Sequence, residues 1–109
     1  MEALVVFCTF PDRETGERIL ATLVEERRIA CGTLIPGASS VYRWEGKIER
    51  ATEALALLKT TGPCWEPLRA RLRELHPYAV PEIVAVPASR VDAEYGRWIE
   101  ESVAPGERA

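Results

Sequence analysis

The spacing of hydrophobic and polar residues changes along the chain, and each change predicts an element of structure. Residues 3–10 are almost continuously apolar and β-favouring, which predicts a strand covered on both faces. Asp12 is a suitable N-cap, and the apolar residues that follow it form one helical stripe: Ile19, Leu20, Leu23 and Val24. This segment therefore predicts an amphipathic helix that packs on a sheet.

A long hairpin is predicted next. The pattern of residues 29–44 is extended, with a bend or bulge at Pro36-Gly37, and residues 47–61 run back after a turn at Glu45-Gly46. The return is polar first and apolar afterwards, so the hairpin has a buried base and an arm that projects from the core. Each strand of it has about fourteen residues, whereas strands usually have about five or six. An arm this long needs a surface to pack on, and a second copy of the chain is the simplest candidate.

The rest of the chain predicts a helix, a short strand and a final helix. Pro67 delays the start of the second helix, whose apolar residues share one face: Trp65, Leu68, Leu72 and Leu75. Residues 75–81 form a connector that two prolines stiffen, and residues 82–87 form a fourth strand. Asp92 caps the last helix, which has its own apolar face: Tyr95, Trp98, Ile99 and Val103.

The order β-α-β-β-α-β-α predicts an α+β fold, the ferredoxin-like βαββαβ sandwich with an extra C-terminal helix. Both long helices then lie on one face of a four-stranded antiparallel sheet. The other face needs cover, which the extra helix and neighbouring subunits would supply. We expect residues 1–103 to form a single domain and residues 104–109 to be a flexible C-terminal tail.

Composition narrows the class of protein. The chain has 109 residues and a net charge of −3, which argues against a nucleic-acid binder held by phosphate contacts. Its longest apolar run has six residues, far fewer than the roughly 20 of a membrane span. The start of the sequence shows no secretory signal, and three cysteines at wide spacing form neither a disulfide framework nor a structural zinc motif. We therefore expect a cytoplasmic protein with free thiols.

Residue usage bears on the habitat of the host. The chain has no asparagine or glutamine, and arginine outnumbers lysine twelve to two. Loss of these thermolabile amides together with many charged residues is typical of a thermophile. A GC-rich genome would explain the arginine bias equally well.

Several segments, in order, resemble the CutA divalent-cation-tolerance family. The tyrosine-x-tryptophan-glutamate-glycine-lysine block at 42–47 and the histidine-proline-tyrosine block at 76–78, followed by proline-glutamate at 81–82, are the specific ones. The others are Cys8-Thr9, Pro11-Asp12, Arg28-Ile29-Ala30-Cys31, Ile35-Pro36-Gly37, Leu58-Lys59-Thr60-Thr61 and Trp98-Ile99. The resemblance covers about residues 4–103 of the chain.

The resemblance implies a ferredoxin-like subunit in a compact homotrimer, similar in architecture to PII signalling proteins. It also implies a link to tolerance of copper and other divalent cations in bacteria, without a catalysed reaction. Ala79 stands where the family often has a glutamate, so one potential oxygen ligand is absent.

Cys31 and His76 are the candidate ligands for a soft metal, because thiolate and imidazole together suit copper and zinc. Glu82 is a possible oxygen ligand. Two ligands are too few for a closed site, so a trimer would have to add others across an interface. Alternatively, Cys31 is an ordinary small buried strand residue and His76 a structural side chain at a helix end.

Lys59, Tyr78 and Glu82 form a second candidate group. If the strand ends that carry Lys59 and Glu82 approach the connector, these side chains could line a cleft for a small anionic ligand. They could equally form a salt-bridged structural cluster.

Two aromatic residues near the hairpin turn, Tyr42 and Trp44, are more typical of a trimer interface than of a ligand site. Cys8 ends a buried strand. Cys64 begins a helix, where it is either a reactive thiol or a bystander near solvent.

The leading hypothesis is a homotrimeric divalent-cation tolerance protein that sequesters or senses metal, chiefly copper, and is not an enzyme. One alternative is a PII-like trimer that binds a small anion in clefts between subunits. The other is a stable trimeric scaffold for an unidentified protein partner. No metal is expected to be required for folding.

Overall fold

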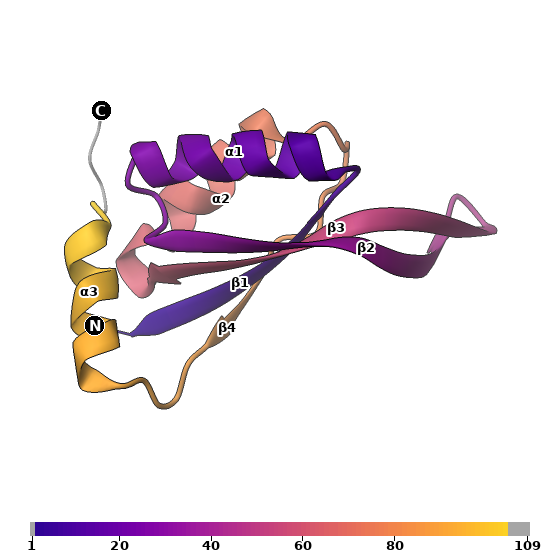
Figure 1. The fold of residues 1–109 in the computed structure, drawn as a ribbon. Coiled ribbons are helices and arrows are strands. Elements are labelled where there is room, and N and C mark those ends of the chain that lie inside the picture. The colour runs from indigo at the N-terminus through magenta and orange to yellow at the C-terminus, as the bar shows by residue number, and fades with distance from the viewer. Residues whose placement is uncertain (1, 105–109) are drawn as a thin grey trace.

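The computed structural model describes residues 2–104 and contains the predicted elements in the predicted order (Figure 1). In chain order they are β1 (Ala3–Phe10), α1 (Arg13–Glu25), β2 (Cys31–Trp44), β3 (Lys47–Thr61), a 3₁₀ turn η1 (Gly62–Cys64), α2 (Trp65–Leu75), β4 (Val84–Pro87) and α3 (Ala93–Ser102). The strands form one sheet in the order β2-β3-β1-β4, with every neighbouring pair antiparallel. This confirms the ferredoxin-like α+β fold. Of the predicted tail, residues 105–109 lie outside the described residues.

Two of the predicted helix starts, at Asp12 and Asp92, are confirmed by their caps. The Asp12 carboxylate accepts a 2.8 Å hydrogen bond from the backbone N–H of Thr15, and Asp92 accepts one of 3.2 Å from that of Tyr95. α2 begins at Trp65 after a 3₁₀ turn, so the prediction that Pro67 delays the helix is wrong. Pro67 lies in the first turn, where a missing N–H costs nothing. Two predicted strands begin two residues later than expected, at Cys31 and at Val84.

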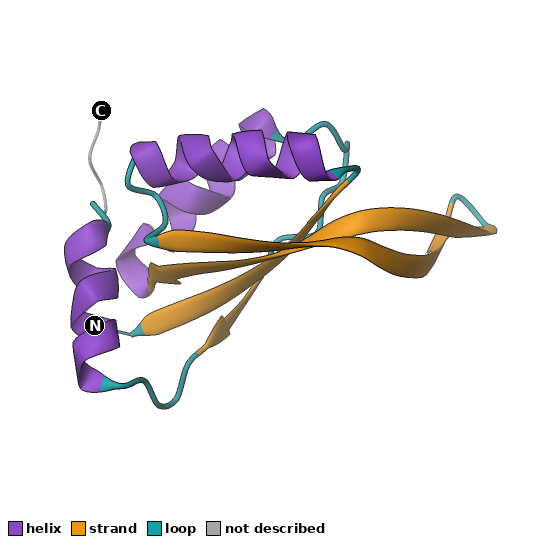
Figure 2. Ribbon diagram, in the orientation of Figure 1, coloured by secondary structure: helices purple, strands orange, loops and turns teal. Residues whose placement is uncertain are grey.

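The hydrophobic core lies between the sheet and the two long helices, which cover the same face of it (Figures 1 and 2). Alternate residues of β1 are buried there. α1 contributes Ile19, Leu20 and Leu23, but Val24 is 42% exposed, because it lies one further step around the helix from Leu23. In α2 the predicted stripe packs as expected, with Leu68 and Leu72 fully buried.

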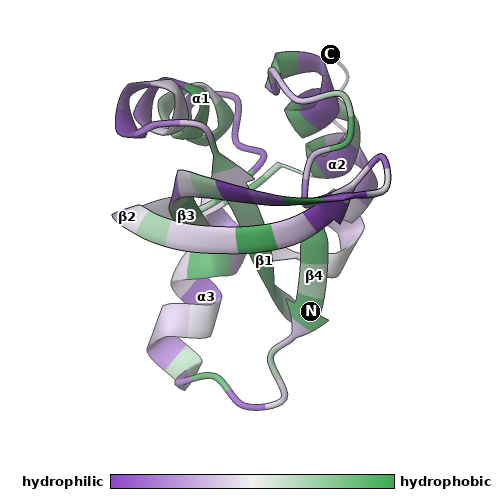
Figure 3. Cartoon of the chain, turned by 90° about the vertical axis from the view of Figure 1, so that its right-hand side faces the viewer, coloured by the Kyte–Doolittle hydropathy of each residue, from purple (hydrophilic) through white to green (hydrophobic). Residues whose placement is uncertain are grey.

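The opposite face of the sheet is only partly covered (Figure 3). α3 lies across one end of it, where Ile99 and Val103 pack on Ala30 and Cys64. Cys64 is therefore 1% exposed, so the expectation of a reactive or solvent-near thiol is wrong. On β4, Val84 and Val86 remain about half exposed, at 51% and 46%. Among the residues described, nothing covers this part of the sheet.

β2 and β3 continue beyond the rest of the sheet as a two-stranded arm (Figure 2). It ends in a turn at Glu45 and Gly46, both with positive φ (50° and 82°), which is the combination that favours a tight two-residue hairpin. The arm carries large exposed apolar side chains: Val41, Tyr42, Trp44 and Ile48. The predicted projecting arm is confirmed.

The bulge predicted at Pro36-Gly37 is present. Ile35 pairs with Leu55, but the next pair is Ala38 with Glu53, so β2 has one residue more than β3 at this point. Gly37 has φ +81°, the left-handed conformation that such an extra residue often needs.

A cleft at the root of the hairpin arm

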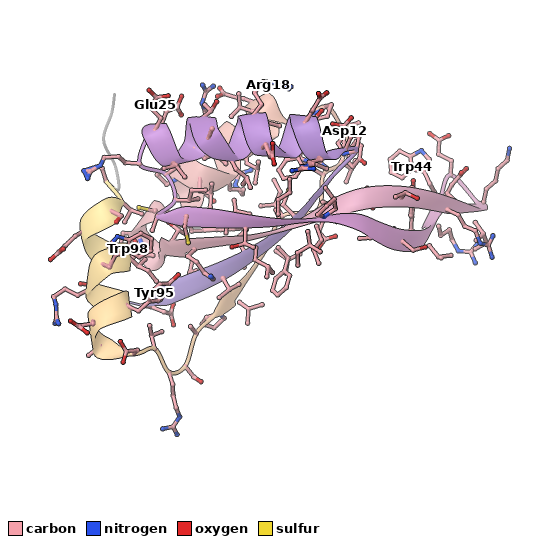
Figure 4. All side chains as sticks on the ribbon, in the orientation of Figure 1. Asp12, Arg18, Glu25, Trp44, Tyr95 and Trp98 are labelled. Carbon is pink, nitrogen blue, oxygen red and sulfur yellow. The ribbon has the colours of Figure 1, made fainter. Side chains whose placement is uncertain are left out.

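A cleft of about 500 Å³ opens where the arm leaves the sheet, within the size range of small-ligand sites. Three segments line it: the end of β1, both strands of the arm, and the connector between α2 and β4. The lining residues are Thr9, Ser40, Val41, Tyr42, Trp44, Glu53, Tyr78, Ala79, Val80 and Glu82. Figure 4 shows Trp44 on the arm beyond the end of α1 that carries Asp12.

The bulge is what places the aromatic side chains in this cleft. Before it, the odd-numbered residues of β2 share the partly covered face of the sheet with Leu55 and Leu57. After it, even-numbered residues take that face, because Ala38 pairs with Glu53. Tyr42 and Trp44 consequently lie on the same face as Glu53. If every residue of β2 after Ile35 kept pairing with β3 in a continuous register, Tyr42 and Trp44 would lie on the other face of the arm.

One side-chain hydrogen bond in the cleft joins Tyr78 to Glu53. The Tyr78 hydroxyl donates a 2.7 Å hydrogen bond to Oε2 of Glu53, whose side chain is 8% exposed. Burial raises the pKa of Tyr78, and its hydrogen bond to Glu53 and the negative charge there raise it further. The phenol therefore keeps its proton and remains a donor to the carboxylate across the physiological range.

His76 supports the connector and carries no charge. Its Nδ1 accepts a hydrogen bond of 3.1 Å from the backbone N–H of Tyr78, so the ring proton lies on Nε2, which donates to the carbonyl of Thr9 over 2.8 Å. The ring stacks on Phe10 with centroids 4.9 Å apart. Burial lowers the pKa of His76, which favours this neutral form.

With both ring nitrogens engaged, His76 has no free atom for a metal in this conformation. This favours the structural alternative for His76 over the role of ligand. For His76 to bind a metal as predicted, one of these two hydrogen bonds would have to break.

The predicted site residues fall into two separate places. Tyr78 and Glu82 line the cleft, together with the predicted interface residues Tyr42 and Trp44. Lys59 does not join them. It pairs with Val5 of β1 and lies at the other end of the sheet, with its Nζ 5.8 Å from the ring centroid of Tyr95 on α3.

Cys31 lies at that other end as well, opposite Lys59 in the register. Its Sγ is 3.6 Å from the Tyr95 hydroxyl, and the side chain is partly exposed. Thr9, the partner of His76, follows Val5 by four positions on β1, so Cys31 and His76 are separated by about 13 Å along the strand direction alone. One chain therefore does not bring Cys31, His76 and Glu82 together. Within residues 2–104, no group of three or more histidine, cysteine, aspartate or glutamate side chains is arranged to hold a metal ion.

Sequence reasoning missed Glu53 as a site residue. It stands at the boundary between the polar and apolar halves of the return strand, which was the available signal. Its pairing with Tyr78 spans 25 positions and depends on the tertiary fold.

Known proteins resemble this chain in sequence and in fold over nearly its whole length. Residues 4–102 match the model of the family described as CutA1 divalent ion tolerance protein. The chain belongs to this family. Among CutA relatives, the divalent-cation tolerance protein of Thermus thermophilus is 44% identical over 98 residues, covering 90% of this chain and 95% of the relative. That of Citrobacter koseri is 41% identical over 102 residues, covering 94% and 89%.

Solved CutA structures share the fold. The T. thermophilus structure superposes with a TM-score of 0.91 at 42% identity and covers 94% of this chain and 99% of its own. CutA1 from Oryza sativa gives 0.92 at 33% identity, with 95% of each chain covered. The Archaeoglobus fulgidus CutA, described as periplasmic, gives 0.90 at 35% identity, covering 94% and 99%. In this chain, no helix among residues 2–104 is long and apolar enough to cross a membrane.

Proposed function

We propose that this CutA chain acts in divalent-cation tolerance by binding the metal itself, with copper as the chief cation, and that it sequesters or senses the metal without catalysing a reaction. The family supports a role in cation tolerance. The single observation that carries direct binding is the placement of the thiols.

Of the three cysteines, Cys31 alone is accessible. Cys8 and Cys64 are buried at 0% and 1% exposure, and burial raises the pKa of Cys8 to about 12. A thiolate is the ligand form that copper and zinc prefer, and a buried thiol is poorly placed to supply it. Cys31 is therefore the proposed primary ligand, with the Tyr95 hydroxyl beside it.

A homotrimer is part of the proposal, because one chain offers too few ligands. The arm and the uncovered face of the sheet carry exposed apolar side chains, which favour burial against other copies. Tyr42 and Trp44 are the proposed anchors of that interface. His76 and Glu82 would reach Cys31 only from another copy, and His76 only after one of its hydrogen bonds breaks.

We also propose a cytoplasmic location, supported by the three free thiols. A heat-adapted host is supported by the lack of asparagine and glutamine. The anion-binding alternative is not favoured, because Lys59 lies away from the cleft and no lysine or arginine is among the cleft residues named above. The exposed apolar surface of the arm is compatible with the scaffold alternative, which predicts no metal uptake.

A calorimetric titration tests the proposal. The reduced protein is titrated with Cu(I) held by a competing chelator, and separately with Zn²⁺, beside Cys31→Ser and Cys64→Ala. We expect saturable uptake at a fixed ratio of metal to chain, lost in Cys31→Ser and kept in the control Cys64→Ala. Uptake that is absent in the native chain, or equal in native protein and Cys31→Ser, contradicts the proposal. Size-exclusion chromatography with light scattering on the same samples measures the oligomeric state.

A further inference from the structure

The cleft at the root of the arm differs from the proposed metal site in position and in chemistry. It lies at the opposite end of the sheet from Cys31 and contains no cysteine. Three of its lining residues are aromatic, Tyr42, Trp44 and Tyr78, and two are carboxylates, Glu53 and Glu82. None of the described residues that line it is a lysine or arginine.

The two charged side chains that line the cleft, Glu53 and Glu82, are both acidic. The Glu53 charge is held in place by the 2.7 Å hydrogen bond from Tyr78, so it does not depend on a mobile side chain. The raised pKa of Tyr78 also reflects the nearby negative charge of Asp12, and His76 behind the connector is neutral. Among the described cations, Arg73 donates to the carbonyl of Ala79 over 3.4 Å, Lys47 is the register partner of Trp44 at the turn, and the positive charge of Arg18 acts on Asp12.

Aromatic faces beside fixed carboxylates select for a particular kind of ligand. The rings attract a cation through their quadrupoles and also contact apolar groups attached to it. A bare divalent metal ion fits less well, because Mg²⁺ and Ca²⁺ require six or more oxygen ligands and gain nothing from aromatic rings. An anion would meet only like charge. A small organic cation, with its charge on nitrogen and carbon around it, matches both features.

We propose that this cleft binds a small organic cation of the alkylammonium or guanidinium class, with Glu53 and Glu82 balancing the charge and Tyr42, Trp44 and Tyr78 contacting its body. The site goes beyond the proposed metal binding and does not include its primary ligand, Cys31. Tyr42, Trp44 and Glu82 take part in both proposals. The variant Cys31→Ser separates the two, because it is expected to abolish metal uptake and to leave tetramethylammonium binding unchanged.

Tetramethylammonium is the probe, because it has charge and methyl groups but no hydrogen-bond donor. The full-length protein in its native assembly is titrated at constant ionic strength against sodium chloride, and the tryptophan indole N–H signals are followed by NMR. The chain has three tryptophans, so Trp44 is resolved from Trp65 and from Trp98 on α3, which serves as an internal control. We expect a saturable shift of the Trp44 signal and no shift of Trp98. Neutral tert-butanol, of similar size, is expected to give no saturable shift.

Two isosteric variants test the role of charge. Glu82→Gln removes one carboxylate at the cleft, whereas Glu25→Gln makes the same change at the other end of α1 from Asp12 (Figure 4). Because Glu82 is exposed, we expect its loss to weaken tetramethylammonium binding about three- to fivefold, and the control to change it less than about twofold. No saturable shift at Trp44, an equal response to tert-butanol or to inorganic phosphate, or equal effects of the two variants would each overturn the proposal. If another copy fills the cleft, the first of these results follows.

Discussion

Removing the Tyr78 hydroxyl is expected to destabilise the fold measurably, although the aromatic ring stays in place. In Tyr78→Phe the 2.7 Å hydrogen bond to Glu53 is lost, while the contact of the ring with His76, 4.8 Å between centroids, is kept. Glu53 is 92% buried, so its carboxylate cannot regain full hydration without moving. Hydrogen bonds to charged groups contribute about 1.5–3 kcal/mol, and we expect a loss of that size per chain.

Tyr95→Phe is the matched control. It makes the same chemical change at a side chain that is 41% exposed and whose hydroxyl contacts the Cys31 thiol at 3.6 Å. We expect it to cost less than about 0.5 kcal/mol.

The assay is equilibrium unfolding in guanidinium chloride at pH 7. All variants are measured at one protein concentration, because the stability of an oligomer depends on concentration. Glu53→Gln and the double variant complete a mutant cycle, whose coupling energy isolates the Tyr78–Glu53 contact. Equal stability losses in Tyr78→Phe and Tyr95→Phe, or a coupling energy near zero, would refute the idea that this hydrogen bond fixes a buried charge.

Two further predictions concern groups that the fold buries. In the native protein, a thiol reagent such as Ellman's reagent is expected to modify one cysteine per chain rapidly, Cys31, and to reach the other two only after unfolding, because they are at most 1% exposed; rapid modification of two or three would contradict the proposed accessibility. The single histidine gives one ring signal in an NMR titration, and we expect a pKa below 6.5 in the folded protein. Stability should then be independent of His76 above pH 6.5 and fall below it by at most about 1.4 kcal/mol per pH unit and per chain, because the unfolded state takes up the proton first; a folded-state pKa above 6.5 would reverse this sign.

Most of the fold was predictable because its signals are local. The apolar run of residues 3–10, the caps at Asp12 and Asp92 and the turn at Glu45-Gly46 each depend on neighbours in sequence, and all are present in the structure. The least accurate boundaries are the starts of β2 and β4. Before β2, Ile29 and Ala30 are apolar and buried although they lie outside the strand, and before β4, Glu82 and Ile83 are not paired with β1.

The candidate sites were less predictable, because they depend on which end of the sheet each segment reaches. Lys59 ends β3 beside the start of β1. α2 then carries the chain away by 11 residues, about 16 Å, before the connector with Tyr78 begins. The strand ends named in the cleft hypothesis therefore point to opposite ends of the molecule, and an antiparallel order of strands would already have indicated this. The neutral state of His76 required the positions of both of its partners, which sequence does not supply.

The extra residue of β2 also bears on how chains of this kind can change in length. Deleting one residue at 36–37 would remove the bulge and leave the hairpin, its turn and the two faces of the outer arm unchanged, because each residue from Ala38 to Trp44 keeps its partner on β3. A deletion of two residues would leave β2 one residue short of β3, so β3 would have to bulge instead or the arm would have to slip by one residue and present its other face. The cleft thus tolerates the loss of the bulge better than a longer deletion at the same point. In an alignment of relatives or a redesigned arm, a gap of one residue here is compatible with the same cleft surface, whereas a gap of two requires a compensating change in β3.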